Sequence, residues 1–187
     1  MEEDDRIAVC RLKRGDWGGL DTLVERYQLK AVRAAFLILR DVQAAEDVTQ
    51  ETFIKVARHI KRFDERRPFA PYFLRSVVNA ALDMAILISR QERASIDIEF
   101  LEERLIAADT VESEAEWNTV KRDVQHALEQ LSPRQRAAIV MRYYLDLSEK
   151  EMAAQMNARP GTVKWLLNEA RARLRDMLGV SHRRSVK

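Results

Sequence analysis

A stripe of basic and amide side chains near the C-terminus has the chemistry to bind DNA. Its members recur at intervals of three and four residues, which places them on one face of a helix: Lys164, Asn168, Arg171 and Arg175. Lysine and arginine pair with phosphate or guanine, and asparagine can hydrogen-bond adenine. The apolar residues of this segment fall on the opposite face, so the stripe would point away from a core. An ordinary helical hairpin with a solvated basic face would give the same pattern.

The segments before this stripe predict a helix-turn-helix. Residues 148–151 have the spacing of a capping box and open a short helix. Residues 157–161 form a turn, and Thr162 opens a last helix that runs to about Leu178. In a helix-turn-helix the second helix lies in the major groove of DNA. The N-terminus of that helix can also donate backbone N–H groups to a phosphate.

A second candidate surface lies on a helix predicted over residues 43–60. Three polar side chains and one isoleucine share the face opposite its apolar residues: Asp47, Gln50, Glu51 and Ile54. An exposed isoleucine among polar groups is typical of a surface that docks another protein. A solvated acidic face is the alternative.

A third candidate surface combines cations with aromatic rings between residues 62 and 79. Arg62, Arg66 and Arg67 alternate with aromatic residues in the loop that precedes a helix over 70–92. Cations that bind the backbone and rings that stack on bases suit single-stranded nucleic acid. The rings could equally belong to the core, and for Phe69 and Phe73 we favour the core.

The elements that position these surfaces are predicted to be helices. Apolar residues recur with helical spacing over about 17–39, which a break near residue 29 could divide, and over 43–60 and 70–92. The chain has five glycines and four prolines, too few for the many tight turns of a β-sandwich or barrel. We therefore expect an all-α fold.

The C-terminal half contains one further helix start. Serine, proline and glutamine at positions 132, 133 and 135 form an N-cap, a first turn and a capping box. The helix that follows is predicted to bury Ile139, Val140 and Tyr143.

Composition limits the class of protein. The 187 residues carry 32 basic and 30 acidic side chains, a net charge of +2, and 47% hydrophobic residues. One cysteine, Cys10, excludes a disulfide scaffold and a cysteine-rich metal site. We find no apolar run near the ~18 residues that a membrane span needs, and the acidic start is unlike a secretory signal. We expect a cytoplasmic protein without membrane insertion.

Charge is segregated along the chain. Residues 95–117 hold eight acidic side chains against Arg104, whereas residues 159–187 hold eight basic ones against two acidic ones. Such blocks favour different partners for different parts of the chain. We interpret the acidic block as a linker between two helical domains, although a solvated loop would have the same composition. The predicted boundaries are 1–94, 95–113 and 114–187.

The sequence contains few residues in arrangements that enzymes use for catalysis. The three histidines, His59, His126 and His182, are isolated from one another. There is no metalloprotease motif, phosphate-cradling glycine loop or nucleophile elbow. We expect a protein that is not an enzyme and uses neither a metal nor another cofactor.

Four segments together resemble a bacterial RNA polymerase sigma factor of the extracytoplasmic-function (ECF) branch. They occur in the family's order and spacing, and the second and fourth are quite specific together. They are Gly15-Asp16 with Leu20, Leu23, Val24 and Tyr27; residues 45–56; Tyr72 to Asp83; and Leu128 to Arg175, with Leu131-Ser132-Pro133 and Gly161-Thr162-Val163-Lys164.

The resemblance implies roles for all three surfaces. A sigma2-like domain would dock on the clamp of core RNA polymerase through Asp47, Gln50, Glu51 and Ile54. The loop 61–71 and the next helix would open the minus-ten promoter element and hold a flipped base. The residues implied there are Arg62, Phe63, Arg66, Arg67, Tyr72, Arg75, Asn79 and Arg90.

A sigma4-like domain would read the minus-thirty-five element through Arg159, Thr162, Lys164, Trp165, Asn168, Arg171 and Arg175. The acidic linker would thread the polymerase's positively charged channel, and an anti-sigma factor would control the protein.

Two departures from the family pattern keep other functions open. Ile86, Leu87 and Ile88 stand where the family often has arginines, and Trp165 and Glu169 stand in the otherwise basic recognition helix. They motivate the alternative of a sigma-like decoy, which binds an anti-sigma factor without reading DNA. A helix-turn-helix repressor would need a dimer and tight DNA binding without polymerase.

Overall fold

The computed structural model describes residues 2–94 and 123–184, and all regular elements in these ranges are helical. The first set comprises α1 (Glu2–Lys13), α2 (Gly18–Leu39), α3 (Val42–His59), the short 3-10 helix η1 (Ile60–Arg62) and α4 (Phe69–Ala94). The second set comprises a helical segment over 123–129, α6 (Pro133–Ile139), the π-helix η2 (Val140–Tyr144), α7 (Glu149–Gln155) and α8 (Pro160–Arg184). The all-α prediction is confirmed. The predicted linker 95–113 and the domain boundary at 114 lie outside the described residues.

Local chemistry explains where the first helices begin and end. α2 runs unbroken past residue 29 and ends at Arg40, which adopts a left-handed backbone with φ 66°. Asp41 then caps α3, because its carboxylate accepts a hydrogen bond from the Ala44 backbone N–H at 2.9 Å. α1 was not predicted. It packs closely on α2 at Gly19, where a Cβ would overlap the Ala8 carbonyl oxygen.

Aromatic rings form the centre of the N-terminal bundle. Phe73 is fully buried and stacks on Phe53 and Phe69, with ring centroids 4.1 and 5.7 Å away. Phe69 is 2% exposed, so the expectation that Phe69 and Phe73 belong to the core is confirmed. Full burial of one such ring contributes roughly 1.5–3 kcal/mol.

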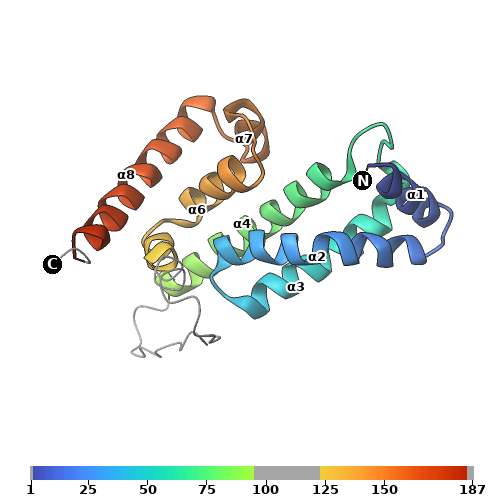
Figure 1. The fold of residues 1–187 in the computed structure, drawn as a ribbon, viewed down its shortest axis with the longest axis horizontal. Helices are drawn as coiled ribbons and strands as arrows, with labels where there is room; N and C mark the ends of the chain where they lie inside the picture. The colour runs from blue at the N-terminus through green and yellow to red at the C-terminus, as the bar shows by residue number, and fades with distance from the viewer. Residues whose placement is uncertain (1, 95–122, 185–187) are drawn as a thin grey trace.

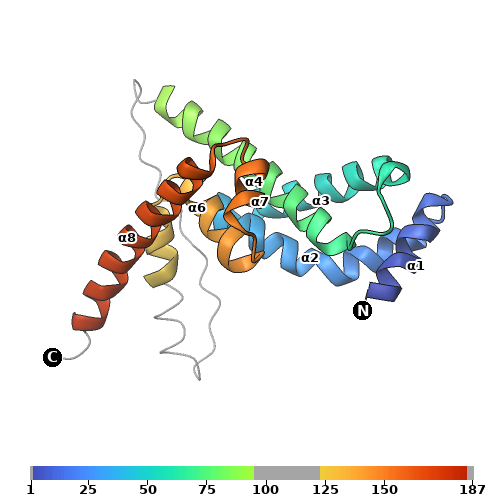
Figure 2. The same cartoon turned by 90° about the horizontal axis from the view of Figure 1, so that it is seen from above.

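The C-terminal set forms the predicted helix-turn-helix. Both capping boxes are present, at Ser132 with Gln135 and at Ser148 with Glu151. The turn between α7 and α8 contains Asn157 with φ 46°, a left-handed conformation that asparagine tolerates well. Figure 1 shows α6, α7 and α8 in orange to red beside one end of the α2–α4 bundle. Figure 2 shows from above that α1 and α8 lie at opposite ends of the molecule.

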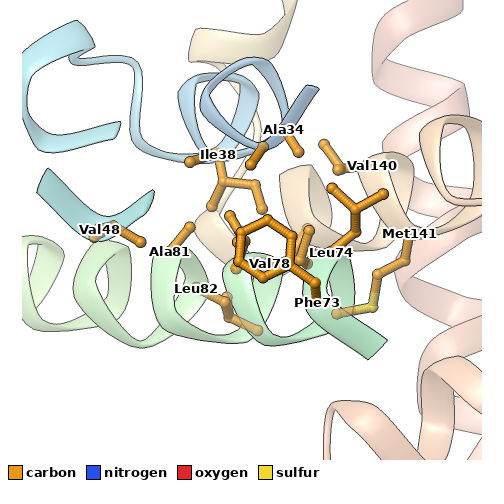
Figure 3. Close-up of a cluster of buried hydrophobic side chains, with 14 of the residues drawn as sticks. Ala34, Ile38, Val48, Phe73, Leu74, Val78, Ala81, Leu82, Val140 and Met141 are labelled. Atoms are coloured by element: carbon orange, nitrogen blue, oxygen red, sulfur yellow. The ribbon is translucent and has the colours of Figure 1, made fainter. Parts of the chain in front are cut away.

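The two sets of helices pack against each other. Val140 and Met141 of η2 belong to the same buried hydrophobic cluster as Ile38 of α2 and Leu74 of α4 (Figure 3). Figure 3 shows these side chains meeting between the two helix sets. Thus, where the sequence predicted two linked domains, the structure shows two helix sets with a shared apolar contact.

Polar contacts reinforce this packing. Arg40, which caps the C-terminus of α2, pairs with Glu129 and also donates to the Gln125 carbonyl. The Tyr144 hydroxyl donates to the Lys30 carbonyl at 3.1 Å. On α4, the carbonyl of residue 75 accepts a hydrogen bond from the Gln155 amide of α7 at 3.1 Å.

Two sequence interpretations need correction. Tyr143 was predicted to be buried but is 63% exposed, because a π-turn replaces regular α-helix over Val140–Tyr144. Phe69–Gln91 is long and apolar enough to cross a membrane, which corrects the expectation that no apolar run approaches that length. Its buried residues pack in the bundle with α2 and α3, which identifies α4 as a core helix.

Candidate functional site

The outer face of α3 carries the first candidate surface. Asp47, Gln50 and Glu51 are exposed, and Ile54 is 48% exposed. The opposite face of α3 is buried against the bundle through Val48, Thr52, Phe53 and Val56. The Gln43 side-chain amide donates to the Asp47 carboxylate at 3.1 Å, along the same face. The structure therefore brings the four predicted docking residues together on one accessible surface.

A groove between the loop after α3 and the start of α4 forms the second candidate surface. It has a volume of 870 Å³. Six of the eight predicted minus-ten residues line it: Arg62, Phe63, Arg67, Tyr72, Arg75 and Asn79. Cations, an aromatic ring and an amide thus meet in one concave site, the combination that binds a single strand with unstacked bases.

The aromatic residues of the groove divide into a buried ring and an exposed one. Phe63 is 8% exposed and packs against Phe69 edge to face at 5.8 Å. Tyr72 is 37% exposed, and its ring centroid lies 4.8 Å from that of Phe63. From the sequence, both Phe63 and Tyr72 were expected to be able to stack on bases. The burial of Phe63 corrects that expectation: its ring supports Tyr72, and Tyr72 is the ring that is accessible.

Ion pairs fix the loop that forms one side of the groove. Asp64 accepts hydrogen bonds from the Arg66 side chain and backbone, and these lower the pKa of Asp64 to about 2. Lys13 of α1 donates to the Phe63 carbonyl at 2.7 Å and pairs with Glu65 at 2.7 Å. α1 therefore anchors the loop. No local sequence pattern predicts this contact, because it joins residues 50 or more positions apart.

Arg66 and Arg90 lie outside the groove. Arg66 is exposed and lines an adjacent pocket of 350 Å³ beside Arg6 of α1. Arg90 is exposed near the end of α4, about 22 Å along the helix from Arg75 at 1.5 Å per residue. The eight predicted minus-ten residues therefore do not all line one pocket: Arg66 lines a neighbouring pocket, and Arg90 lies farther along α4.

Arg75 is engaged by the C-terminal helix set. Its guanidinium pairs with Glu151 of α7, and its carbonyl accepts a hydrogen bond from Gln155. Glu151 also accepts hydrogen bonds from the Ser148 backbone and hydroxyl, which together with Arg75 lower the pKa of Glu151 to about 2. The capping-box glutamate of α7 is therefore also the ion-pair partner of Arg75, a predicted minus-ten contact.

The exposed face of α8 is the third candidate surface. Six of the seven predicted minus-thirty-five residues are exposed: Arg159, Thr162, Lys164, Trp165, Asn168 and Arg175. Arg171 is half-buried because Tyr143 lies against it. Val163, Leu166 and Leu167 are buried on the opposite face, as their spacing predicted. Trp165, 59% exposed, presents an indole ring beside the cations of this helix.

The described residues contain no group of three or more His, Cys, Asp or Glu side chains that could hold a metal ion. The Cys10 thiol, on α1, donates a hydrogen bond to Glu65 at 3.2 Å. This bond is the main cause that raises the pKa of the Cys10 thiol, and Cys10 therefore has a structural partner in the loop after α3.

Comparison with known proteins places both helix sets in one family. Residues 23–93 match the family described as Sigma-70 region 2, and residues 121–174 match Sigma-70, region 4. The chain is 30% identical to the ECF RNA polymerase sigma-E factor of Escherichia coli, covering 89% of this chain and 90% of that protein. It is 29% identical to the RNA polymerase sigma-H factor of Pseudomonas aeruginosa, covering 91% of each.

The fold is also similar to a solved sigma factor. The sigma factor RpoE of Bartonella quintana, crystallised with the anti-sigma factor NepR, matches with a TM-score of 0.61 and 21% identity. The match covers 85% of this chain and 98% of that one. At this identity the likeness concerns the fold, and it agrees with the sequence matches. The chain belongs to the ECF family of RNA polymerase sigma factors.

Proposed function

We propose that this chain binds core RNA polymerase and directs it to promoter DNA for initiation. The observation that carries the proposal is the arrangement of its surfaces. A docking face, a groove lined by cations and an aromatic ring, and a basic recognition helix lie on separate parts of one scaffold. The docking face and the recognition helix each have a buried opposite face on α3 and α8, which gives them a defined orientation.

Core polymerase binds at the face of α3 formed by Asp47, Gln50, Glu51 and Ile54. Ile54 supplies apolar contact area, and the polar residues around it supply hydrogen bonds and charge complementarity. All four residues stay exposed with α6, α7 and α8 in place.

The groove holds single-stranded minus-ten DNA. Tyr72 stacks on a base, Arg62 and Arg67 contact phosphates, and Asn79 can hydrogen-bond a base edge. Arg75 can also bind a DNA phosphate once its ion pair with Glu151 is broken. An exposed ion pair contributes little to stability, so the exchange costs little.

α8 contacts the minus-thirty-five duplex. Lys164, Arg171 and Arg175 bind phosphates or guanine, and Asn168 can bind adenine. Thr162 and Arg159 lie at the helix N-terminus, where a phosphate also receives backbone N–H groups. The exposed ring of Trp165 fits an apolar contact with a thymine methyl group.

The remaining features follow from the same proposal. Residues 1–94 and 114–187 are the two functional domains, and the acidic residues 95–113 connect them. The protein works in the cytoplasm as an initiation factor, with no catalytic residue, metal or cofactor of its own. Control by an anti-sigma factor is supported by the fold likeness to RpoE, which was crystallised with such a partner.

The test is reconstituted transcription. Purified chain is added to core polymerase with a pool of promoter fragments from the source genome, and transcripts are sequenced from their 5′ ends. We expect transcripts with a shared upstream sequence that disappear when the chain is omitted. A chain that binds an anti-sigma factor but neither core polymerase nor promoter DNA would be a decoy, and the proposal would be wrong.

A further inference from the structure

Tyr143 has an unusual position that the family assignment does not explain. It lies in the π-helix Val140–Tyr144, where the Leu145 N–H donates to the Val140 carbonyl at 3.1 Å, one residue beyond α-helical spacing. The extra residue in this turn shifts the side chains relative to a regular α-helix. Val140 and Met141 remain buried, whereas Tyr143 is 63% exposed. Single π-turns are rare and often occur at functional positions.

The exposed ring is directed at α8. The Tyr143 hydroxyl accepts a hydrogen bond from Arg171 Nε at 2.8 Å. The Arg171 guanidinium carbon also lies 5.6 Å from the Tyr143 ring centroid, a cation–π contact. Two different contacts from one side chain restrict a guanidinium that would otherwise sample many rotamers.

The geometry leaves part of the guanidinium available. An arginine side chain has five N–H donors in a planar fork, and Tyr143 uses the one on Nε. Among the described residues, the structure gives the terminal nitrogens of Arg171 no hydrogen-bond partner. A phosphate approaching the end of the fork can then take two parallel hydrogen bonds.

We propose that Tyr143 is a positioning residue that holds Arg171 for contact with a DNA phosphate. This inference rests on the proposed function, because it requires α8 to bind DNA. It adds a residue outside α8 to the recognition surface. It also gives the π-turn a role: because of the extra residue in this turn, the Tyr143 side chain lies outside the core and contacts α8.

Binding of the full chain to DNA tests this role. The probe is a 30-base-pair duplex of random sequence, and affinity is measured over a series of salt concentrations. Phosphate contacts dominate such binding, and each lost contact lowers the salt slope by about one. Tyr143→Phe removes the hydroxyl and keeps the ring. Tyr144→Phe is the matched control, because that hydroxyl donates to the Lys30 carbonyl of α2 and not to α8.

We expect Tyr143→Phe to weaken binding by about two- to tenfold, the range for loss of one hydrogen bond, and to lower the salt slope. Tyr144→Phe should leave the slope unchanged. The decisive comparison is in the Arg171→Ala background, where Tyr143→Phe should have no further effect. Equal losses in both backgrounds would overturn the inference, since Tyr143 would then act independently of Arg171.

The outcomes separate this inference from the proposed function. If Arg171→Ala and Lys164→Ala weaken binding but Tyr143→Phe does not, the positioning role is wrong and DNA binding by α8 stands. If neither Arg171→Ala nor Lys164→Ala changes binding, α8 does not bind DNA, and both proposals fail. Thermal unfolding of each variant checks that the fold is retained, as the exposure of Tyr143 predicts.

Discussion

Two faces of the N-terminal bundle differ in their relation to the C-terminal helices. The outer face of α3, with Asp47, Gln50 and Glu51, is accessible. On α4, Arg75 pairs with Glu151 and its carbonyl accepts a hydrogen bond from Gln155. In this conformation the chain can present its proposed polymerase-docking face without rearrangement, whereas full use of the proposed minus-ten face requires α7 to release Arg75. The contrast suggests an order of events in which docking precedes complete engagement of DNA.

Charge reversal on the α3 face should have the largest effect. Asp47→Arg replaces a carboxylate with a cation in a proposed interface, and like charges brought together at an interface cost several kcal/mol. We expect affinity for core polymerase to fall at least about tenfold. Glu25→Arg makes the same charge change at an exposed position of α2 and serves as control. Equal losses for the two variants would mean that overall charge, and not this face, governs binding.

Weakening α7 should affect only the α4 face. Ser148→Ala removes the N-cap hydroxyl that accepts a hydrogen bond from the Glu151 backbone N–H. We expect a loss of about 1 kcal/mol in unfolding free energy, measured by denaturant titration. Binding to core polymerase should remain unchanged. A variant with reduced polymerase affinity would show that the two faces are not independent.

Removing the charge of Glu151 tests the interaction with Arg75 more selectively. Glutamine also fits the third position of a capping box, so Glu151→Gln retains the cap and removes the ion pair. Because an exposed pair is worth little, binding of a single-stranded minus-ten oligonucleotide should improve by no more than about fivefold. Fluorescence anisotropy measures this binding. Weaker binding would indicate that Glu151 supports the DNA-binding surface instead of competing with DNA for Arg75.

Acid should weaken the same contact gradually. The pKa of Glu151 is lowered from 4.5 to about 2, first by the Ser148 backbone hydrogen bond and then by the Ser148 hydroxyl and Arg75. A lowered pKa stabilises the fold above pH 4.5, and this contribution is lost as the pH falls toward 2. The melting temperature of Glu151→Gln should therefore fall less than that of the parent chain between pH 5 and pH 3. Parallel curves would assign the acid sensitivity to other groups.

Local signals in the sequence predicted much of this architecture. The capping boxes at Ser132 and Ser148 set helix starts correctly, because they depend on residues three positions apart. Helical spacing also identified the exposed residues of α3 and α8. Tyr143 was misplaced because a π-turn leaves no simple mark in a pattern of hydrophobic residues.

The features that the sequence did not predict depend on long-range contacts. The anchoring of the loop by Lys13 and the pairing of Arg75 with Glu151 join residues 50 and 76 positions apart. No local pattern encodes such pairs. The family resemblance supplied the roles of the surfaces, but not these contacts.

Site-specific photo-crosslinking tests directly whether core RNA polymerase docks on the outer face of α3. A photoreactive residue is placed at position 50 on α3 or at position 25 on α2, and each full-length variant is mixed with core RNA polymerase and irradiated. We expect a crosslink to a large polymerase subunit from position 50 and none from position 25. A complex that forms normally yet crosslinks only from position 25 would contradict docking through α3.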